Sequence, residues 1–296
     1  MRDGFVEWDG HRTWFGLQGA LHAGGPTPLV ILHGGPGAAH DYLEPIGELA
    51  RISGRPCVFY DQVGCGRSEH LAHAPAGFWT VELFARELGA LVHKLGIDDR
   101  YHVLGQSWGG MLAMEHALGR PAGLRSLVLA NAPASMQTRT TEANRLRGML
   151  PTEVQEVLTS HEAAGTTASD EYRQGVMRFH ERHLCRIPFP ECLQRTFAQI
   201  AEDPTVYHTM NGPSEFQVIG SLRDWNITPR LHDVRVPALV ISGQHDEATP
   251  NVIRPLVQSL PAARWELIGD ASHTPHLEQP ERFLGLVEAF LAAYDC

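Results

Sequence analysis

The stretch Gly105-Gln106-Ser107-Trp108-Gly109-Gly110 decides the fold of this 296-residue chain. It follows the apolar run 101–104 and precedes the helix-like run 111–118. Strand, Gly-x-Ser-x-Gly and helix is the layout of a nucleophile elbow, a tight turn that lifts one hydroxyl clear of a sheet. Such a turn requires little bulk two residues to either side of the serine, which the glycines at 105 and 109 provide. Ser107 is therefore the candidate nucleophile.

Strand-like runs alternate with helical patterns around this elbow. The expected strands are 5–8, 12–17, 28–32, 57–60, 101–104, 124–130, 238–242 and 265–268. The Asp9-Gly10 pair predicts a hairpin between the first two. Apolar residues recur at helical spacing between Thr80, an expected N-cap, and Gly96, and another helix is expected to begin at Pro280. We expect an α/β fold with a mostly parallel central sheet flanked by helices.

The pattern changes between residues 133 and 231. Strand-like apolar runs disappear there, polar and charged residues become more frequent, and several prolines interrupt the segment. We expect an inserted helical cap at 133–231, with the α/β body split into 1–132 and 232–296.

Composition narrows the classes of function. The formal net charge is −10 and no basic stripe is visible, which argues against nucleic acid or an anionic membrane as the main partner. No signal peptide and no run of about 18 apolar residues is seen, so no membrane span is expected. Five scattered cysteines without zinc spacing predict free thiols and a cytoplasmic location. No cofactor is expected, and no pattern indicates an oligomeric state.

A serine nucleophile needs a base and an orienting carboxylate. Asp246 follows the strand that ends near 243, and His273 follows the strand that ends at 268. In parallel α/β folds, catalytic groups lie on loops at the carboxyl ends of strands. The order Ser107, Asp246, His273 matches that of α/β hydrolases. Asp270 is a rival carboxylate, but we expect it to shape its own turn.

The segment His33-Gly34-Gly35-Pro36-Gly37 follows a strand and predicts the oxyanion loop. Adjacent glycines let the main chain approach a reacting carbonyl, so that an N–H can point at its oxygen. We assign the two donors to the Gly35 and Trp108 N–H groups, the latter being the residue after the nucleophile. His33 is expected to pack or to hydrogen-bond within this loop.

Two further groups of residues carry side chains that can bind a metal or react. The residues His180, His183 and Cys185 could hold a metal, but no second ligand cluster accompanies them, and we predict no metal site. Cys65 is expected beside the oxyanion region. Its thiol is either reactive or buried and inert, and the sequence leaves both possibilities open.

Taken together, these motifs resemble the prolyl aminopeptidases, also called proline iminopeptidases, and the related L-amino acid amidases. The matching segments are 33–37, Asp61-Gln62-x-Gly64-x-Gly66-x-Ser68, 105–110, Asn211-Gly212-Pro213-Ser214-Glu215-Phe216, Gly243-x-x-Asp246-Glu247-x-x-Pro250 and Ser272-His273. They span nearly the whole chain in the family's order. The resemblance implies an α/β-hydrolase body and a helical cap that closes over the amino end of the substrate.

The resemblance also implies that Glu215 and Glu247 bind the free α-amino group of the substrate. Two carboxylates beside a partly closed pocket repel each other and are costly to desolvate, unless a cation such as an ammonium lies between them. We expect Trp108, Phe216 and Trp225 to wall the pocket for the first side chain, although packing within the cap is the simpler role for Trp225.

The predicted function is a serine hydrolase that cleaves the amide bond after an unblocked N-terminal amino acid. Its substrates would be small molecules, namely short peptides or amino acid amides with a free amine. An esterase or carbon–carbon hydrolase without an amine requirement is the alternative, and a non-catalytic module of the same fold is a third. Proline preference over other first residues, and peptidase over amidase activity, stay open.

Overall fold

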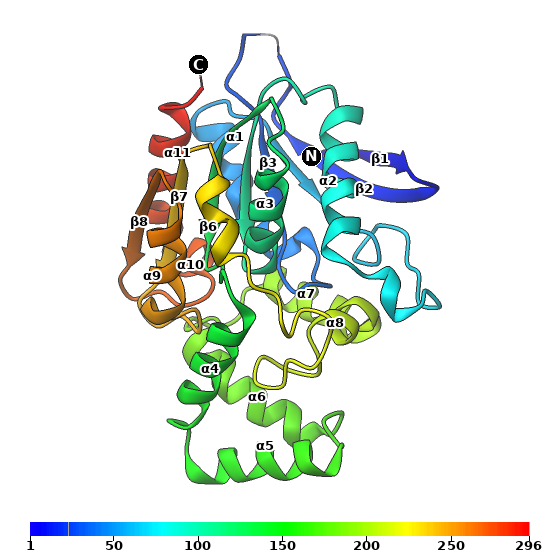
Figure 1. Cartoon of the computed structure of the whole chain (residues 1–296), viewed down its shortest axis with the longest axis vertical. Helices are drawn as coiled ribbons and strands as arrows, with labels where there is room; N and C mark the ends of the chain where they lie inside the picture. Colours follow the sequence, from blue (N-terminus) through cyan, green and yellow to red (C-terminus); the bar gives the residue numbers. More distant parts are fainter. Residues whose placement is uncertain (23, 296) are drawn as a thin grey trace.

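The structure, a computed structural model, describes residues 1–22 and 24–295. Its centre is an eight-stranded sheet in the order β1-β2-β4-β3-β5-β6-β7-β8 (Figure 1). The pairs β1–β2 and β2–β4 are antiparallel, and every other pair is parallel. The predicted mostly parallel sheet is confirmed. The strands are β1 Arg2–Trp8, β2 His11–Gln18, β3 Leu29–Leu32, β4 Cys57–Tyr60, β5 Tyr101–Gln106, β6 Leu124–Ala130, β7 Ala238–Gly243 and β8 Ala263–Ile268.

Helices cover both faces of the sheet, as its fully apolar central strands require. Val30 and Leu32 of β3 join one core cluster with α2 and α3, whereas Leu29 and Ile31 join a second with η1 and α11. The helices of this part are η1 His40–Glu48, α1 Leu49–Ile52, η2 Ala76–Phe78, α2 Val81–Lys94, α3 Trp108–Leu118, α9 Pro250–Ser259, α10 Pro275–Glu278 and α11 Pro280–Ala292.

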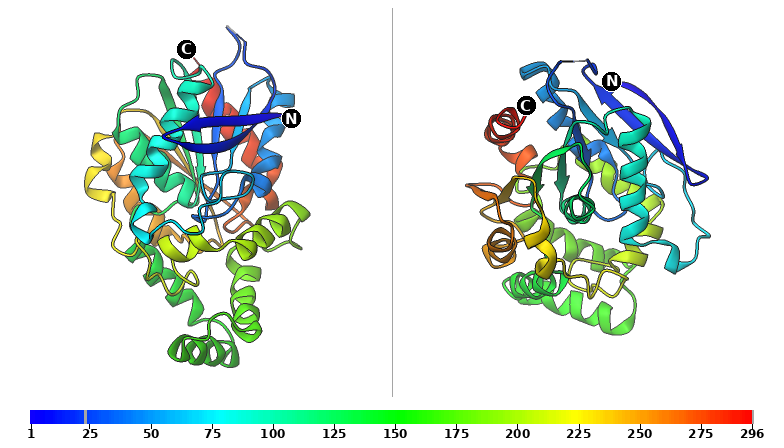
Figure 2. Two further views of the ribbon diagram at one scale, coloured as in Figure 1. Left: turned by 90° about the vertical axis from the view of Figure 1, so that its right-hand side faces the viewer. Right: turned by 45° about the horizontal axis from the view of Figure 1, so that its top comes forward.

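The segment between β6 and β7 is helical. It contains α4 Met136–Arg147, α5 Thr152–Ala164, α6 Asp170–His183, α7 Glu191–Glu202, α8 Thr205–Met210 and η3 Thr228–Asp233. Both views in Figure 2 show α5 and α6 standing off from the sheet. We call α4 to α8 the cap helices. The division of the chain at 132 and 231 stays a prediction.

Local signals set several element ends. Thr80 Oγ1 accepts a hydrogen bond from Leu83 N at 3.2 Å, which confirms the predicted N-cap of α2. Pro280 is the first residue of α11, as expected. The 3-10 helix η1 was not predicted; Pro45, a residue that usually interrupts helices, lies inside it. Within the described part of the chain, no helix has the length and apolarity needed to cross a membrane.

One buried acid makes a testable contribution to stability. Glu87 of α2 is fully buried and accepts hydrogen bonds from Thr13 Oγ1 and from Val63 N. Burial raises its pKa to about 8, despite those two hydrogen bonds. The folded protein therefore keeps this proton as the pH rises through 4.5, where the unfolded chain loses it, and stability falls from there up to about pH 8.

We expect Glu87→Gln to remove this decrease in stability with rising pH, because the neutral amide of glutamine does not titrate. In the wild type, Glu87 should lower the free energy of unfolding by on the order of 3 kcal/mol between pH 5 and pH 8.5. This contribution should be absent in the variant. Urea denaturation at the two pH values measures it. A wild type and a variant with equal pH dependence would show that Glu87 is ionised in the folded protein.

Candidate active site

Ser107 lies between β5 and α3 with φ 54° and ψ −119°, a conformation rare for a residue with a side chain. A Cβ added at Gly105 would lie 2.2 Å from Gly109 O, and one added at Gly109 would lie 2.2 Å from Leu32 O. The turn therefore excludes side chains at both positions, as the motif predicts. Ser107 itself is half-buried, whereas the residues on either side of it are buried.

His273 and Asp246 form a hydrogen-bonded pair. His273 Nδ1 donates to Asp246 Oδ1 at 2.7 Å, which leaves Nε2 as the nitrogen available to a nucleophile. Asp246 also accepts from Ala248 N at 2.9 Å and from Asn131 Nδ2 at 2.5 Å. Burial lowers the pKa of His273, but the charges of Asp246 and Glu247 outweigh burial and raise it overall. The loops that follow β5, β7 and β8 thus supply Ser107, Asp246 and His273.

The side chain before the nucleophile ties these loops together. Gln106 Nε2 donates to His273 O at 2.9 Å, and Gln106 Oε1 accepts from Tyr42 Oη at 2.6 Å. Tyr42 Oη in turn accepts from Gly34 N at 2.8 Å. This buried chain links the oxyanion loop, the elbow and the histidine loop. The elbow motif contains Gln106 but predicts no role for its side chain, and no motif in the sequence marks Tyr42.

The predicted oxyanion donors lie on adjacent segments. Trp108 is the first residue of α3, where an N–H has no partner within the helix. Gly35 has φ 109°, which a residue with a side chain rarely adopts. Neither the Trp108 N–H nor the Gly35 N–H has a hydrogen-bond acceptor among the described residues, 1–22 and 24–295. Both donors can therefore serve an external oxygen, although their joint role stays a prediction.

His33 is a structural residue of the oxyanion loop. Its Nδ1 donates to Gly34 O at 3.0 Å, and its Nε2 accepts from Gln62 N at 3.0 Å. Gln62 Oε1 accepts from the indole of Trp108 at 2.8 Å. These contacts confirm His33 as a hydrogen-bonding residue. They also show what Gln62 does: it braces the residue after the nucleophile.

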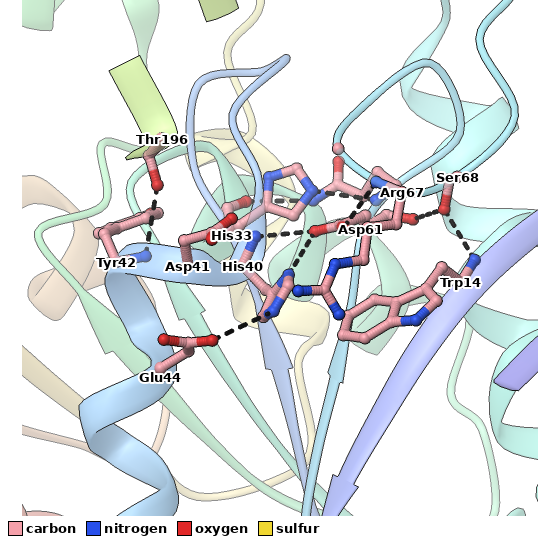
Figure 3. A network of polar contacts seen from close by, with 12 residues as sticks. Trp14, His33, His40, Asp41, Tyr42, Glu44, Asp61, Arg67, Ser68 and Thr196 are labelled. Atoms are coloured by element: carbon pink, nitrogen blue, oxygen red, sulfur yellow. Dashed lines mark hydrogen bonds and ion pairs between the residues drawn. The ribbon is translucent and has the colours of Figure 1, made fainter. Parts of the chain in front are cut away.

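The preceding residue of that motif, Asp61, is the centre of a second buried network (Figure 3). Its Oδ1 accepts from both the main-chain N and Nδ1 of His40, each at 2.8 Å, and its Oδ2 accepts from Arg67 N at 2.9 Å. Burial raises the pKa of Asp61, but the bond and the charge of His40 lower it overall. The Asp61 carboxylate thus fixes the loop 61–68 against η1, beside the site.

The two glutamates expected to bind the amine are both buried, and each already has a cationic neighbour. Glu247 Oε1 accepts from Arg139 Nη2 at 2.6 Å, and Glu215 Oε1 pairs with His180 Nε2 at 2.9 Å. Arg139 Nη1 also donates to Glu215 O at 3.3 Å. We expected carboxylates that remain uncompensated until an ammonium arrives. The cap helices α4 and α6 instead compensate one oxygen of each.

The second oxygen of each carboxylate is different. Oε2 of Glu215 and Oε2 of Glu247 are buried, and neither has a hydrogen-bond partner in the parts of the chain that the structure describes. Buried polar atoms are nearly always satisfied, so such atoms point to an absent water or ligand. Glu247 Oε1 lies 3.8 Å from His273 Nε2, which puts this acid beside the candidate base.

The three aromatic residues predicted as a wall occupy packed positions. Trp108 is 1% exposed and its indole donates to Gln62. Phe216 lies edge-on against Phe179 at 4.7 Å, in the core cluster of the cap helices. Trp225 donates to Glu115 Oε1 of α3 at 2.9 Å, so its indole N–H is directed at the body and not at His273. Their role as a wall stays a prediction.

Tyr207 is an aromatic residue that the sequence did not indicate. It belongs to α8, and a Cβ at Gly37 would lie 2.8 Å from its main-chain N. Burial and the neighbouring charge of Glu215 raise the pKa of its hydroxyl. Tyr207 thus lies between the oxyanion loop and the two glutamates. No motif or spacing marks it, because only the folded cap brings it there.

The sequence also singled out the group His180, His183 and Cys185 as a possible metal site and Cys65 as a possible reactive thiol. His183 Nδ1 bonds to His245 O at 2.9 Å and His183 O accepts from His273 N at 3.2 Å, so this histidine abuts the site without a metal partner. Over the described residues, no group of three His, Cys, Asp or Glu side chains could hold a metal ion. Cys65 is buried, and burial raises its thiol pKa well above the ordinary value, which favours the inert reading.

The chain is similar to proteins of one well-known hydrolase family. A family model described as the alpha/beta hydrolase fold matches residues 27–280, and the chain belongs to that family. Within it, the chain belongs to the proline iminopeptidases, and is therefore a hydrolase. A proline iminopeptidase of Lactobacillus delbrueckii subsp. bulgaricus is 34% identical over 270 residues, which cover 91% of each chain. The family predicted from the sequence motifs is confirmed.

Two solved structures extend the similarity to the cap helices. The proline iminopeptidase of Mycobacterium smegmatis is 47% identical, with a TM-score of 0.92 and 99% of each chain covered. The structure of VinJ is 50% identical, with a TM-score of 0.96 and 99% of each chain covered. Both superpose along the whole chain, so the relation includes the α/β body and the helical insertion.

Proposed function

We propose that the protein is a serine aminopeptidase or amidase that cleaves the amide bond after an unblocked N-terminal residue, as the name of its proline iminopeptidase relatives suggests. One observation carries the free-amine requirement. Glu247 Oε1 lies 3.8 Å from Nε2 of the candidate base His273, and the other oxygen of the same carboxylate, Oε2, is buried without a hydrogen-bond partner among the described residues. The α-amine of such a substrate is two bonds from the carbonyl carbon that Ser107 attacks, so an amine bound there keeps that carbonyl close to His273.

The reaction follows the serine-hydrolase scheme. Ser107 Oγ attacks the carbonyl carbon while His273 Nε2 takes the hydroxyl proton, and Asp246 stabilises the imidazolium through Nδ1. The N–H groups of Gly35 and Trp108 stabilise the oxyanion. The tetrahedral intermediate then expels the leaving amine, which receives the proton from His273 Nε2. The resulting ester on Ser107 is hydrolysed by water through the same steps.

The free amine binds at the cap side of this centre. Oε2 of Glu215 and Oε2 of Glu247 have no hydrogen-bond partner among the described residues, and an ammonium has donors for both, while its positive charge offsets theirs. An N-acetyl group supplies neither the charge nor more than one donor. The proposed substrates are accordingly small molecules with a free amine. A cytoplasmic location also belongs to this proposal, and rests on the free thiols of Cys57, Cys65, Cys185 and Cys192.

We expect Glu215→Gln and Glu247→Gln each to lower kcat/KM for a prolyl arylamide by about 100-fold, because losing one partner of a buried charge pair costs about 2–5 kcal/mol. Activity on the N-acetyl arylamide should stay within about threefold, since that substrate does not use the pair. Glu153→Gln, on the exposed face of α5, is the matched control and should change neither rate. Equal losses on both substrates would exclude an amine-specific role.

A further inference from the structure

His180 is a buried histidine of α6 that contacts one of the two candidate amine-binding acids. Its Nε2 pairs with Glu215 Oε1 at 2.9 Å, and its Nδ1 has no partner in the described part of the chain. On α7, Phe197 packs against the imidazole with ring centroids 5.5 Å apart. The ring is thus fixed in place, in contact with one of the two acids that bind the amine in the proposed function.

The charged groups that face His180 come from three other segments. They are Glu215 in the segment between α8 and η3, Glu247 after β7, and His273 after β8. Arg139 of α4 pairs with Glu247 and stays protonated at all relevant pH values. When His180 is neutral, Arg139 and the two glutamates together carry one net negative charge. When His180 is protonated, that net charge is zero.

We propose that His180 is a positioning and charge-tuning residue of the amine pocket: its neutral form leaves one negative charge for the substrate ammonium, and its protonated form competes with that ammonium for the carboxylates. This inference rests on the proposed function. Ammonium binding then expels a proton from His180, so the affinity for a free amine rises with pH although the amine itself does not titrate.

The charges around His180 are consistent with an affinity for free amines that rises with pH. Burial lowers the pKa of His180, but the charge and the hydrogen bond of Glu215 outweigh burial and raise it above 6.5. Burial raises the pKa of Glu215, but His180 and Arg139 outweigh it and hold that pKa well below its usual range. In the free enzyme His180 therefore holds its proton more tightly than an ordinary histidine does. A substrate cation placed between Glu215 and Glu247 reverses the balance.

The test uses L-prolinol, which carries the ring ammonium but no bond to cleave, as an inhibitor of prolyl arylamide hydrolysis. Its alkyl ammonium titrates near the lysine value of about 10.4 and stays charged up to pH 8.5. We expect its inhibition constant to fall from pH 6.5 to 8.5. His273 also contributes to that fall, so the measured quantity is the difference between the wild type and His180→Gln.

In His180→Gln the amide can still donate to Glu215, but nothing titrates there. The fall in the inhibition constant should be about tenfold larger in the wild type than in the variant, the change that one pKa unit represents. His180→Asn should behave like His180→Gln, which covers the case in which one variant folds poorly. His232→Gln, on exposed η3, is the matched control and should titrate like the wild type.

Tetrahydrofurfuryl alcohol, which has an ether oxygen in place of the ammonium, separates the two proposals. Selective inhibition by L-prolinol, with equal falls in the wild type and in both His180 variants, overturns the role of His180 and leaves the amine pocket intact. Equal inhibition by L-prolinol and by the ether, or inhibition by neither, overturns the amine pocket and with it the inference on His180.

Discussion

Replacing Ser107 by alanine should lower kcat by roughly a millionfold, the loss that follows when the nucleophile of a serine hydrolase is removed. Alanine cannot form the acyl-enzyme, so only oxyanion stabilisation and substrate binding remain. The variant should fold, because alanine and serine carry the same Cβ at the φ of 54° that the turn imposes. Steady-state hydrolysis of a prolyl arylamide measures the loss, and thermal unfolding checks the fold.

Covalent labelling tests independently whether Ser107 is the nucleophile. A serine-reactive phosphonate should modify the wild type at Ser107, as seen by peptide mass spectrometry, and should leave Ser107→Ala unmodified. Ser160→Ala, on the exposed face of α5, is the matched control and should retain full activity and labelling. A Ser107→Ala enzyme that keeps more than about 1% of wild-type kcat would exclude Ser107 as the nucleophile.

Asp246→Asn should lower kcat by about 10⁴-fold. Asp246 accepts hydrogen bonds at both oxygens, from His273 Nδ1 and Ala248 N at Oδ1 and from Asn131 Nδ2 at Oδ2. An amide nitrogen placed at Oδ1 faces His273 and forces the proton of the neutral imidazole onto Nε2. That nitrogen can then no longer accept the proton of Ser107.

The loop of the candidate base supplies the control for this prediction. Asp270 precedes His273 by three residues and adopts φ 55°, a conformation that asparagine tolerates well. Asp270→Asn should therefore keep kcat within about twofold. If Asp270→Asn lowers kcat more than Asp246→Asn does, the orienting carboxylate has been assigned to the wrong residue.

Patterns that depend on neighbours in the chain were predictable. The parallel strands follow from apolar runs, the N-cap of α2 from Thr80, and the two glycines of the elbow from a turn in which the main chain passes within 2.2 Å of where their Cβ atoms would lie. Ser107, Asp246 and His273 could be placed because the carboxyl ends of parallel strands meet at one edge.

The contacts that the cap helices make with the site could not be predicted from the sequence. Arg139 and His180 lie on two different cap helices, and no spacing in the chain shows that they meet Glu247 and Glu215. In the sequence, His180 stands out only by its i, i+3 relation to His183, a spacing that suggests a metal ligand and not a partner for Glu215. Tyr42 was missed for a similar reason, since it reaches Gln106 across 64 residues of sequence.

The most direct test of the central claim compares one substrate with its blocked form on the wild-type enzyme. The measurement is kcat/KM for L-prolyl arylamide and for N-acetyl-L-prolyl arylamide at one pH. In the proposed function Glu215 and Glu247 bind the charge that the acetyl group removes, so we predict a ratio of at least about 10³, matching a loss of about 4 kcal/mol. A ratio near one would contradict the account and favour an esterase or carbon–carbon hydrolase of the same fold.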